Sequence, residues 1–189
     1  MLKIGVMKQK KLAVLIILLM SVYSCKKEDL PSKTTDVPIK EITNYLEYDG
    51  TKYELEKCYF LKDNIFIGIQ EDLYSVYLGS KGLQYSSFLQ NIIGTGNGIS
   101  FDITVAGGGP ITGAYATDTL NNVSEPGDLI FIRVIINDDF KIPSNPIGMK
   151  TAEVTIAESV DNNYLIKGTF VSSNGKSAKL NYLGKVGIY

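Results

Sequence analysis

The side chains that most often carry out catalysis or bind metals are scarce in this sequence. Its 189 residues contain no histidine and no tryptophan. The lack of histidine excludes Ser-His-Asp and Cys-His catalysis and every His-ligated metal site. A carbohydrate-stacking surface would have to use tyrosine, and the tyrosines crowded into residues 45–59 are expected mainly as core or sheet-face side chains. Cys58 has no histidine to activate it, and no cysteine partner if Cys25 is modified, which predicts a buried, unreactive thiol.

Carboxylates are the remaining candidates for chemistry. Clusters of oxygen donors occur at residues 71–72, 138–139 and 161–163, but none follows the alternating spacing of a calcium loop, so no metal or other cofactor is predicted. The paired carboxylates of a glycoside hydrolase come together only in the fold and therefore stay open. The glycine-rich residues 94–98 resemble a phosphate loop but lead into a strand instead of a helix, which favours a tight turn.

The distribution of charge argues against a nucleic-acid partner. The first 24 residues carry four lysines and no acid, and the rest of the chain has 15 basic against 20 acidic side chains. Phosphate binding needs clustered lysine and arginine, and Arg133 is the only arginine. An apolar content of 44% with 21% charged residues is typical of a globular protein with a proper core.

The N-terminus has the three-part layout of a secretory signal. Residues 1–11 are basic, residues 12–20 form an unbroken apolar run, and small or medium residues lead to Cys25. The apolar run is far shorter than the roughly 20 residues of a membrane-spanning helix. We therefore predict a signal peptide over residues 1–24.

The end of this signal resembles a bacterial lipoprotein. Val22-Tyr23-Ser24-Cys25 is similar to the lipobox, which implies that Cys25 becomes the acylated first residue of the mature chain. Acyl chains on one residue can anchor a soluble domain firmly to a membrane. The charged residues that follow, including Lys27, Glu28 and Asp29, resemble the surface-export signal of Bacteroidetes lipoproteins. That resemblance implies an outer-membrane protein that faces the cell exterior; the alternative is a charged start to a solvated linker.

The segment after the lipidation site is predicted to be a tether. Residues 25–40 are rich in proline, threonine, serine and charge, and they have no apolar periodicity. From about residue 41 the sequence changes to alternating apolar and polar residues separated by turns. We therefore expect a single β domain over residues 41–189.

Strands dominate this predicted domain. Residues 44–55 predict a hairpin about the two-residue turn Asp49-Gly50, with Glu47 opposite Lys52. The apolar run at residues 129–136 predicts a strand in the middle of a sheet. The one helical expectation is a turn or two at residues 86–93 behind a serine cap. Further strands are expected at 58–62, 65–69, 73–78, 99–106 and 152–158.

A second hairpin is predicted over residues 164–182, about Asn174-Gly175. A strict two-residue turn would place Phe170 opposite Lys179. A three-residue loop with Gly175 as a bulge would place Phe170 opposite Leu180, and this second register is preferred because it keeps the apolar residues on one face.

About nine or ten short strands separated by Gly, Asn and Asp turns predict an all-β fold. The expected architecture is an antiparallel β-sandwich or flattened barrel, and the alternative is a lipocalin-like closed barrel. A filled core would distinguish the sandwich from the barrel, which would hold a cavity.

Several stretches of the mature chain resemble small surface lipoproteins of Bacteroidetes, namely "SCKKED", "YLEYDGTKYELEKCYF", "GTGNGISFDITV", "ITGAYA" and "YLIKGTFVSSNGKSAKLNYLGKV". The resemblance implies a β domain on a lipid tether and brings no catalytic or binding residues. The leading hypothesis is a non-enzymatic binding module that captures glycans or nutrients or adheres to other cells, with a glycan or protein ligand. The alternatives are a lipocalin-like carrier of an apolar ligand and a small carboxylate-based hydrolase.

Overall fold

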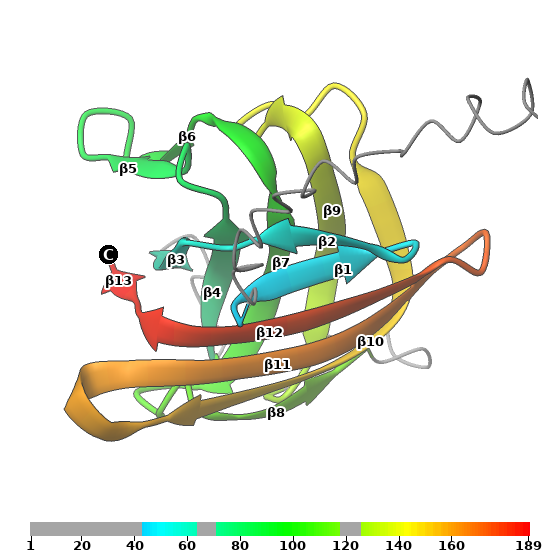
Figure 1. Ribbon diagram of the computed structural model, residues 1–189. Helices are drawn as coiled ribbons and strands as arrows, with labels where there is room; N and C mark the ends of the chain where they lie inside the picture. The colour runs from blue at the N-terminus through cyan, green and yellow to red at the C-terminus, as the bar shows by residue number, and fades with distance from the viewer. Residues whose placement is uncertain (1–42, 64–70, 118–125) are drawn as a thin grey trace, which may run out of the picture. The chain divides into compact units, whose positions relative to one another are not determined.

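The computed structural model describes residues 43–63, 71–117 and 126–189, which lie in one compact unit, Glu41–Tyr189 (Figure 1). The described residues form strands, turns and one short 3-10 helix, η1 (Val160–Asn162), which confirms the predicted all-β class. The strand expected at residues 65–69 lies outside the described residues.

The structure has thirteen described strands, more than the nine or ten predicted, because several are only two to four residues long. They are β1 (Tyr45–Tyr48), β2 (Thr51–Glu54), β3 (Lys57–Asp63), β4 (Glu71–Gly79), β5 (Gln84–Ser86), β6 (Asn91–Ile93), β7 (Thr95–Ala106), β8 (Gly113–Ala116), β9 (Leu129–Asp139), β10 (Ile147–Glu158), β11 (Asn163–Ser172), β12 (Ser177–Lys185) and β13 (Gly187–Ile188).

One continuous sheet, folded at β10, makes two layers. Its strand order is β13-β3-β4-β7-β9-β10-β11-β12-β1-β2, with β8 paired to β10 as a side branch. Ile147 and Gly148 of β10 pair with β9, whereas the rest of β10 pairs with β11. We call β8, β10, β11, β12, β1 and β2 the β12 layer, and β13, β3, β4, β7 and β9 the β7 layer. All pairs are antiparallel except β13 with β3.

The closed lipocalin-like barrel is not formed. The order of described strands begins at β13 and ends at β2, and no described pairing joins these two strands. The space between the layers is filled instead by side chains from both. Phe101 of β7 and Phe170 of β11 have ring centroids 6.2 Å apart, and those of Phe60 and Tyr164 are 5.7 Å apart. This packing between layers is that of a sandwich.

The central strands follow the predicted patterns. Alternate residues of β7 from Ile99 to Val105 are buried in the main core. The run at residues 129–136 becomes β9, which lies in the middle of the sheet between β7 and β10, although Phe131 stays 66% exposed. Ile132 packs in the main core, and Ile135 packs in a second cluster with Leu83, Ile92 and Phe140. The hairpin of β5 and β6 contributes to this second cluster, on the outer side of the β7 layer.

The prediction for the glycine-rich residues 94–98 was wrong, because Thr95–Gly98 belong to β7 instead of a tight turn. Glycine is needed at residue 98 for close packing between strands. A Cβ atom there would collide with the carbonyl oxygen of Leu78 on β4 and with the ring of Phe140.

The prediction of a helical turn at residues 86–93 was also wrong, because these residues form the turn and second strand of the β5–β6 hairpin. Its Ser86 hydroxyl still accepts the N–H of Leu89, at 3.3 Å, so the serine caps a turn without a helix.

The first hairpin has the predicted register, with Glu47 opposite Lys52. Its turn residues Asp49 and Gly50 have φ of 50° and 80°, as a type I′ turn requires.

The register predicted for the second hairpin was wrong, because Phe170 pairs with Ala178 and not with Leu180 or Lys179. The loop is indeed three residues long with a left-handed Gly175, but it starts at residue 173. The N–H of Ser172 donates to the carbonyl of Lys176, and the Ser172 hydroxyl accepts the N–H of Lys176. The closing pair is therefore Ser172 with Lys176. Because the shift from the preferred register is two residues, the apolar residues keep their face.

Candidate functional site

Two rows of side chains cross the outer face of the β12 layer. Each row takes one side chain from each of four neighbouring strands, β10, β11, β12 and β1. Strand pairing aligns the first row, Thr155, Lys167, Asn181 and Tyr45, which we call the tyrosine row. The second row, two residues along each strand, contains Glu153, Thr169, Lys179 and Glu47 and is called the glutamate row. At the usual spacing of strands each row spans about 14 Å.

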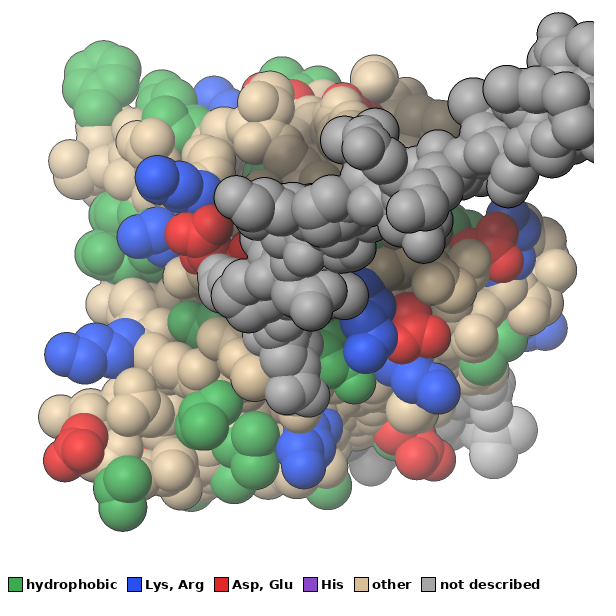
Figure 2. Space-filling view, in the orientation of Figure 1, with side chains coloured by type: hydrophobic (Ala, Val, Ile, Leu, Met, Phe, Trp, Pro, Cys, Tyr) green, Lys and Arg blue, Asp and Glu red, His purple; other side chains and the backbone are tan. Residues whose placement is uncertain are grey.

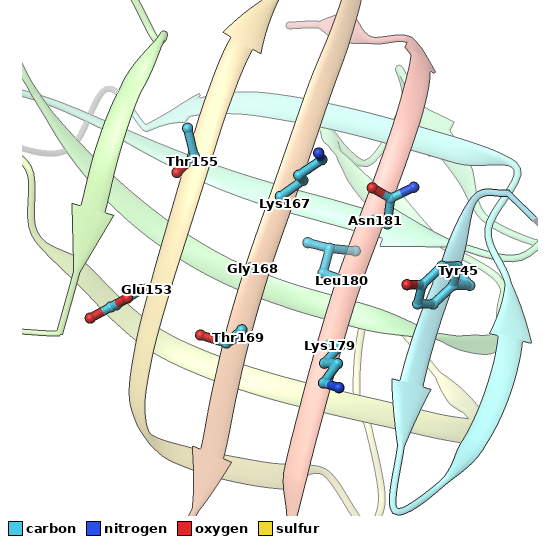
Figure 3. A pocket seen from close by; sticks show the side chains of 9 residues that line it. All are labelled: Tyr45, Glu153, Thr155, Lys167, Gly168, Thr169, Lys179, Leu180 and Asn181. Atoms are coloured by element: carbon cyan, nitrogen blue, oxygen red, sulfur yellow. The ribbon is translucent and has the colours of Figure 1, made fainter.

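A groove of about 440 Å³ lies between the rows (Figure 3). Gly168 and Leu180, which pair across β11 and β12, form its floor because their side-chain positions face the core. Residues of both rows line its sides. A second depression of about 410 Å³ shares Glu153 and Thr169 with the first, so it lies next to the groove, on the side of β8. On the face in Figure 2, basic and acidic side chains are interspersed instead of separated by sign.

Neighbouring contacts fix the position of the polar side chains at the β1 end of the groove. The side-chain amide of Asn181 donates to the carbonyl of Thr43 at 2.7 Å, which leaves its oxygen as an acceptor. The Nζ atom of Lys52 lies 4.4 Å from the centroid of the Tyr45 ring, so a cation–π contact steadies this aromatic wall. The groove therefore combines hydroxyl, amide, ammonium and carboxylate groups beside one aromatic ring. This mixture of donors and acceptors suits a polyhydroxylated ligand.

A second cleft, of about 290 Å³, lies on the outer side of the β7 layer. Its lining includes Asp63, Ser75 and Tyr77 from the sheet and Gln90 and Asn91 from the β5–β6 hairpin.

Asp102, paired with Ser75 across β4 and β7, stands beside this cleft. Burial raises the pKa of the Asp102 carboxyl and nearby Asp63 raises it further, while a hydrogen bond from Ser75 and the charge of Arg133 oppose the rise. Burial, together with the charge of Asp102, also raises the pKa of Tyr77. A carboxyl with a raised pKa beside a cleft is a common property of functional sites.

The residues predicted to carry address signals, Cys25 with Lys27, Glu28 and Asp29, lie outside the described residues. Cys58 is a free, buried thiol as predicted, only 3% exposed, and its burial raises its pKa well above the ordinary value.

Two of the three acidic clusters considered for calcium are engaged in structural contacts. Asp138 accepts the N–H groups of Asp139 and Asn145, and Asp72 forms an ion pair with Lys62 at 2.9 Å. In the described ranges no three His, Cys, Asp or Glu residues are grouped so that they could hold a metal ion.

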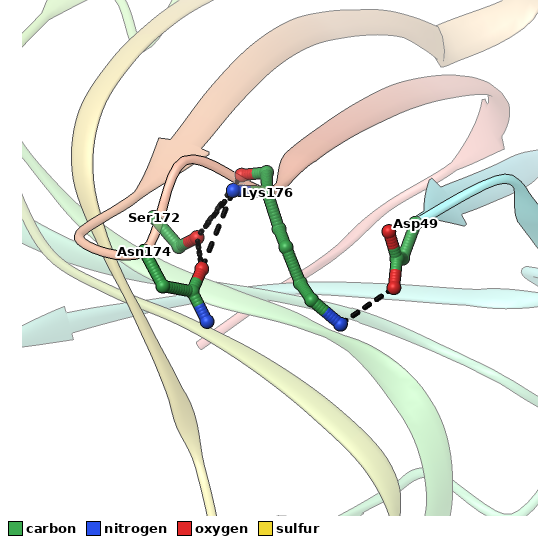
Figure 4. A network of polar contacts seen from close by, with 4 residues as sticks. All are labelled: Asp49, Ser172, Asn174 and Lys176. Carbon is green, nitrogen blue, oxygen red and sulfur yellow. Dashed lines mark hydrogen bonds and ion pairs between the residues drawn. The ribbon is translucent and has the colours of Figure 1, made fainter.

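The polar residues of the β11–β12 loop join the tips of two hairpins (Figure 4). Ser172 donates a hydrogen bond to the Asn174 side chain, and Lys176 pairs with Asp49 in the β1–β2 turn at 2.6 Å. Ser172, Asn174 and Lys176 therefore have a structural role in holding the loop.

The sequence reasoning missed the groove residues. Their one signal was the alternation of polar and apolar residues along β11 and β12, which marks the outer face of each strand. It does not show which residues stand side by side, because that depends on the register.

Comparisons of this chain with protein-family models, curated proteins and solved structures found no match. Among the described residues, no helix is long and apolar enough to cross a membrane.

Proposed function

We propose that this chain is a lipoprotein anchored to the outer membrane through Cys25, and that its β domain faces the cell exterior and captures glycans without catalysing a reaction. The observation that carries the binding role is the polar groove across four strands of the β12 layer. A groove with mixed donors and acceptors and one aromatic wall suits the hydroxyl groups and apolar ring faces of a sugar chain.

The location is supported by the similarity of residues 22–25 to a lipobox and of Lys27, Glu28 and Asp29 to a surface-export signal. Replacing Cys25 by Ala is expected to release the protein from the membrane fraction or leave its signal peptide uncleaved. Unchanged membrane retention of Cys25→Ala would contradict lipidation. Protease treatment of intact cells is expected to remove the domain, and a protected domain would contradict its outward orientation.

The binding role is tested with a glycan array, followed by calorimetry on the best glycan. The variant Tyr45→Ala removes the aromatic wall and is expected to weaken binding about tenfold, as the loss of one stacking contact would. Ile142→Ala, an exposed apolar residue outside the groove, is the matched control and should bind normally. Equal affinities of the two variants would refute the groove as the site. If no glycan binds while whole cells or purified fimbriae do, an adhesive role with a protein ligand replaces glycan capture.

A second candidate function, a small carboxylate-based hydrolase, is favoured by the cleft on the β7 layer. There Asp63 lines the cleft and Asp102, with its raised pKa, could hold the proton that a general acid donates. The test is release of a chromophore from a panel of aryl glycosides by the wild-type chain and by Asp102→Asn. Turnover that Asp102→Asn abolishes would establish the hydrolase, and turnover by neither chain would dispose of it.

A further inference from the structure

Two lysines stand on opposite sides of the groove floor. Lys167 belongs to the tyrosine row on β11, and Lys179 belongs to the glutamate row on β12. Lys167 is directly opposite Asn181 and Lys179 is directly opposite Thr169, so the two lysines are diagonal neighbours. Diagonal neighbours of this kind are about 7–8 Å apart, and their Cβ atoms are somewhat closer. In Figure 3 their side chains extend in different directions from the floor formed by Gly168 and Leu180.

Neither lysine forms an ion pair with any described residue, whereas Lys62 and Lys176 each have an aspartate within 2.9 Å. The nearest acids are in the glutamate row. Glu153 is separated from Lys179 by Thr169 but is a diagonal neighbour of Lys167. Glu47 stands directly opposite Lys179 and also opposite Lys52, so its charge is shared between two lysines. The middle of the groove is therefore positively charged on both sides, and its ends carry the acids.

The two ammonium groups add a feature that a neutral ligand does not require. Sugar hydroxyls are recognised by hydroxyl, amide and carboxylate groups, which the threonines, Asn181 and Glu153 supply. Two ammonium groups that form no ion pair with a described residue gain most from an anion, because a charged acceptor compensates for their lost hydration better than a neutral hydroxyl does.

We propose that the groove takes an acidic glycan, with a carboxylate-bearing sugar over the floor between Lys167 and Lys179. The proposal depends on the proposed glycan-binding function and adds the chemical class of the ligand. The glycan runs across the strands between the two rows, with its carboxylates directed to the lysines and its hydroxyls to Thr155, Thr169 and Asn181.

The test compares two probes of equal length and linkage, an oligogalacturonate and the neutral oligogalactose made from it by carboxyl reduction. Binding to the full chain in detergent is measured by calorimetry at low and at high salt. The acidic probe is expected to bind about five- to tenfold more tightly, the factor that two exposed ion pairs supply. This advantage should shrink as the salt concentration rises, because exposed charges are screened.

Two double variants, each of which removes two positive charges, distinguish an effect of the groove from an effect of the net charge of the protein. Lys167→Gln with Lys179→Gln should remove the preference for the acidic probe. Lys141→Gln with Lys150→Gln, at exposed positions outside the groove, should keep it.

The outcomes also distinguish this inference from the function on which it depends. If both probes bind equally and the preference is absent at low salt, the acidic-ligand inference is overturned while glycan binding stands. If both double variants lose the preference for the acidic probe equally, the inference is overturned too, because the preference then comes from the net charge of the protein. If neither probe binds and no glycan on the array does, both the inference and the proposed function fail.

Discussion

Replacing Gly168 by Ala tests the packing of the sandwich beneath the groove floor. Gly168 lies on β11 and its side-chain position faces the core. A Cβ atom there would lie 2.8 Å and 2.9 Å from two ring atoms of Phe170, and 3.1 Å from a methyl group of Val154. Phe170 is 1% exposed and packs against Phe101 of the other layer, so its ring is part of the close-packed core.

The expected magnitude follows from two opposing effects. Alanine is favoured over glycine inside a strand by about 0.5–1 kcal/mol, because it loses less backbone freedom on folding. Forcing an extra methyl group into a packed core costs about 1–3 kcal/mol. The net loss in the free energy of unfolding is therefore about 1–2 kcal/mol, or a melting temperature about 2–8 °C lower for a chain of this size.

Replacing the ring of Phe170 by a leucine side chain should remove the destabilisation caused by Gly168→Ala. Phe170→Leu lacks the two ring atoms that the new Cβ would meet, so adding Gly168→Ala to Phe170→Leu should be neutral or stabilising. The interaction free energy between the two substitutions is then about 1–3 kcal/mol. Urea unfolding followed by far-ultraviolet circular dichroism measures all four chains. Gly148→Ala is the matched control, because a Cβ atom at Gly148 would meet nothing within 4 Å.

Two results would refute this reasoning. In the first, Gly168→Ala costs no more than Gly148→Ala, which would mean that the ring of Phe170 does not lie over Gly168. In the second, the cost of Gly168→Ala is the same with Leu at position 170, which would place the collision elsewhere.

Three further predictions concern single polar groups. Ser172→Ala should lower the free energy of unfolding, measured in urea, by about 1–2 kcal/mol, because the buried hydroxyl closes the β11–β12 loop. Ser173→Ala, at an exposed position, is the control and should have no such effect. Equal effects of the two variants would contradict the role of the Ser172 hydroxyl. Asp102→Asn should raise the melting temperature at pH 7. Because the folded-state pKa of Asp102 is raised, ionisation destabilises the fold as pH rises from the ordinary value of 3.8 through the raised value. The gain should thus disappear below that window, and a gain that persists in acid would point to another cause. In a chain carrying Cys25→Ala, the Cys58 thiol should not react with Ellman's reagent at pH 8 until urea unfolds the protein; rapid reaction without urea would show that the thiol is accessible.

Short-range chemistry explains which parts of the fold the sequence predicts. Asp49-Gly50 can adopt positive φ at both positions, so the turn alone sets the first hairpin and places Glu47 opposite Lys52. In the second hairpin, the side chain of Ser172 closes the loop one residue earlier than Asn174-Gly175 suggests. A serine hydroxyl that bonds its neighbours' backbone leaves no distinct pattern in sequence.

Tertiary contacts decide the places where local pattern fails. Residues 86–93 have a serine cap and apolar spacing for a helical turn, yet Ile92 packs against Leu83 and Ile135 in the second cluster as part of a hairpin. The groove is unpredictable for a related reason. Lys167, Asn181 and Tyr45 come from three strands, and a register shift of two residues would bring different residues together.

The start of the described chain has a mechanical consequence. The side-chain amide of Asn44 donates to the carbonyl of Leu183 at 3.0 Å and accepts the N–H of the same residue at 2.8 Å, while Asn181 holds the carbonyl of Thr43. A pull on the segment before Thr43 therefore enters the domain through β12, the strand that carries Lys179 and Asn181. Because β1 pairs with β12 on one side and with β2 on the other, the load does not act on an edge strand that could peel away alone. If residues 25–40 act as the predicted tether, a ligand held in the groove would bear on the same strand, β12, so the force between ligand and tether would bypass most of the core.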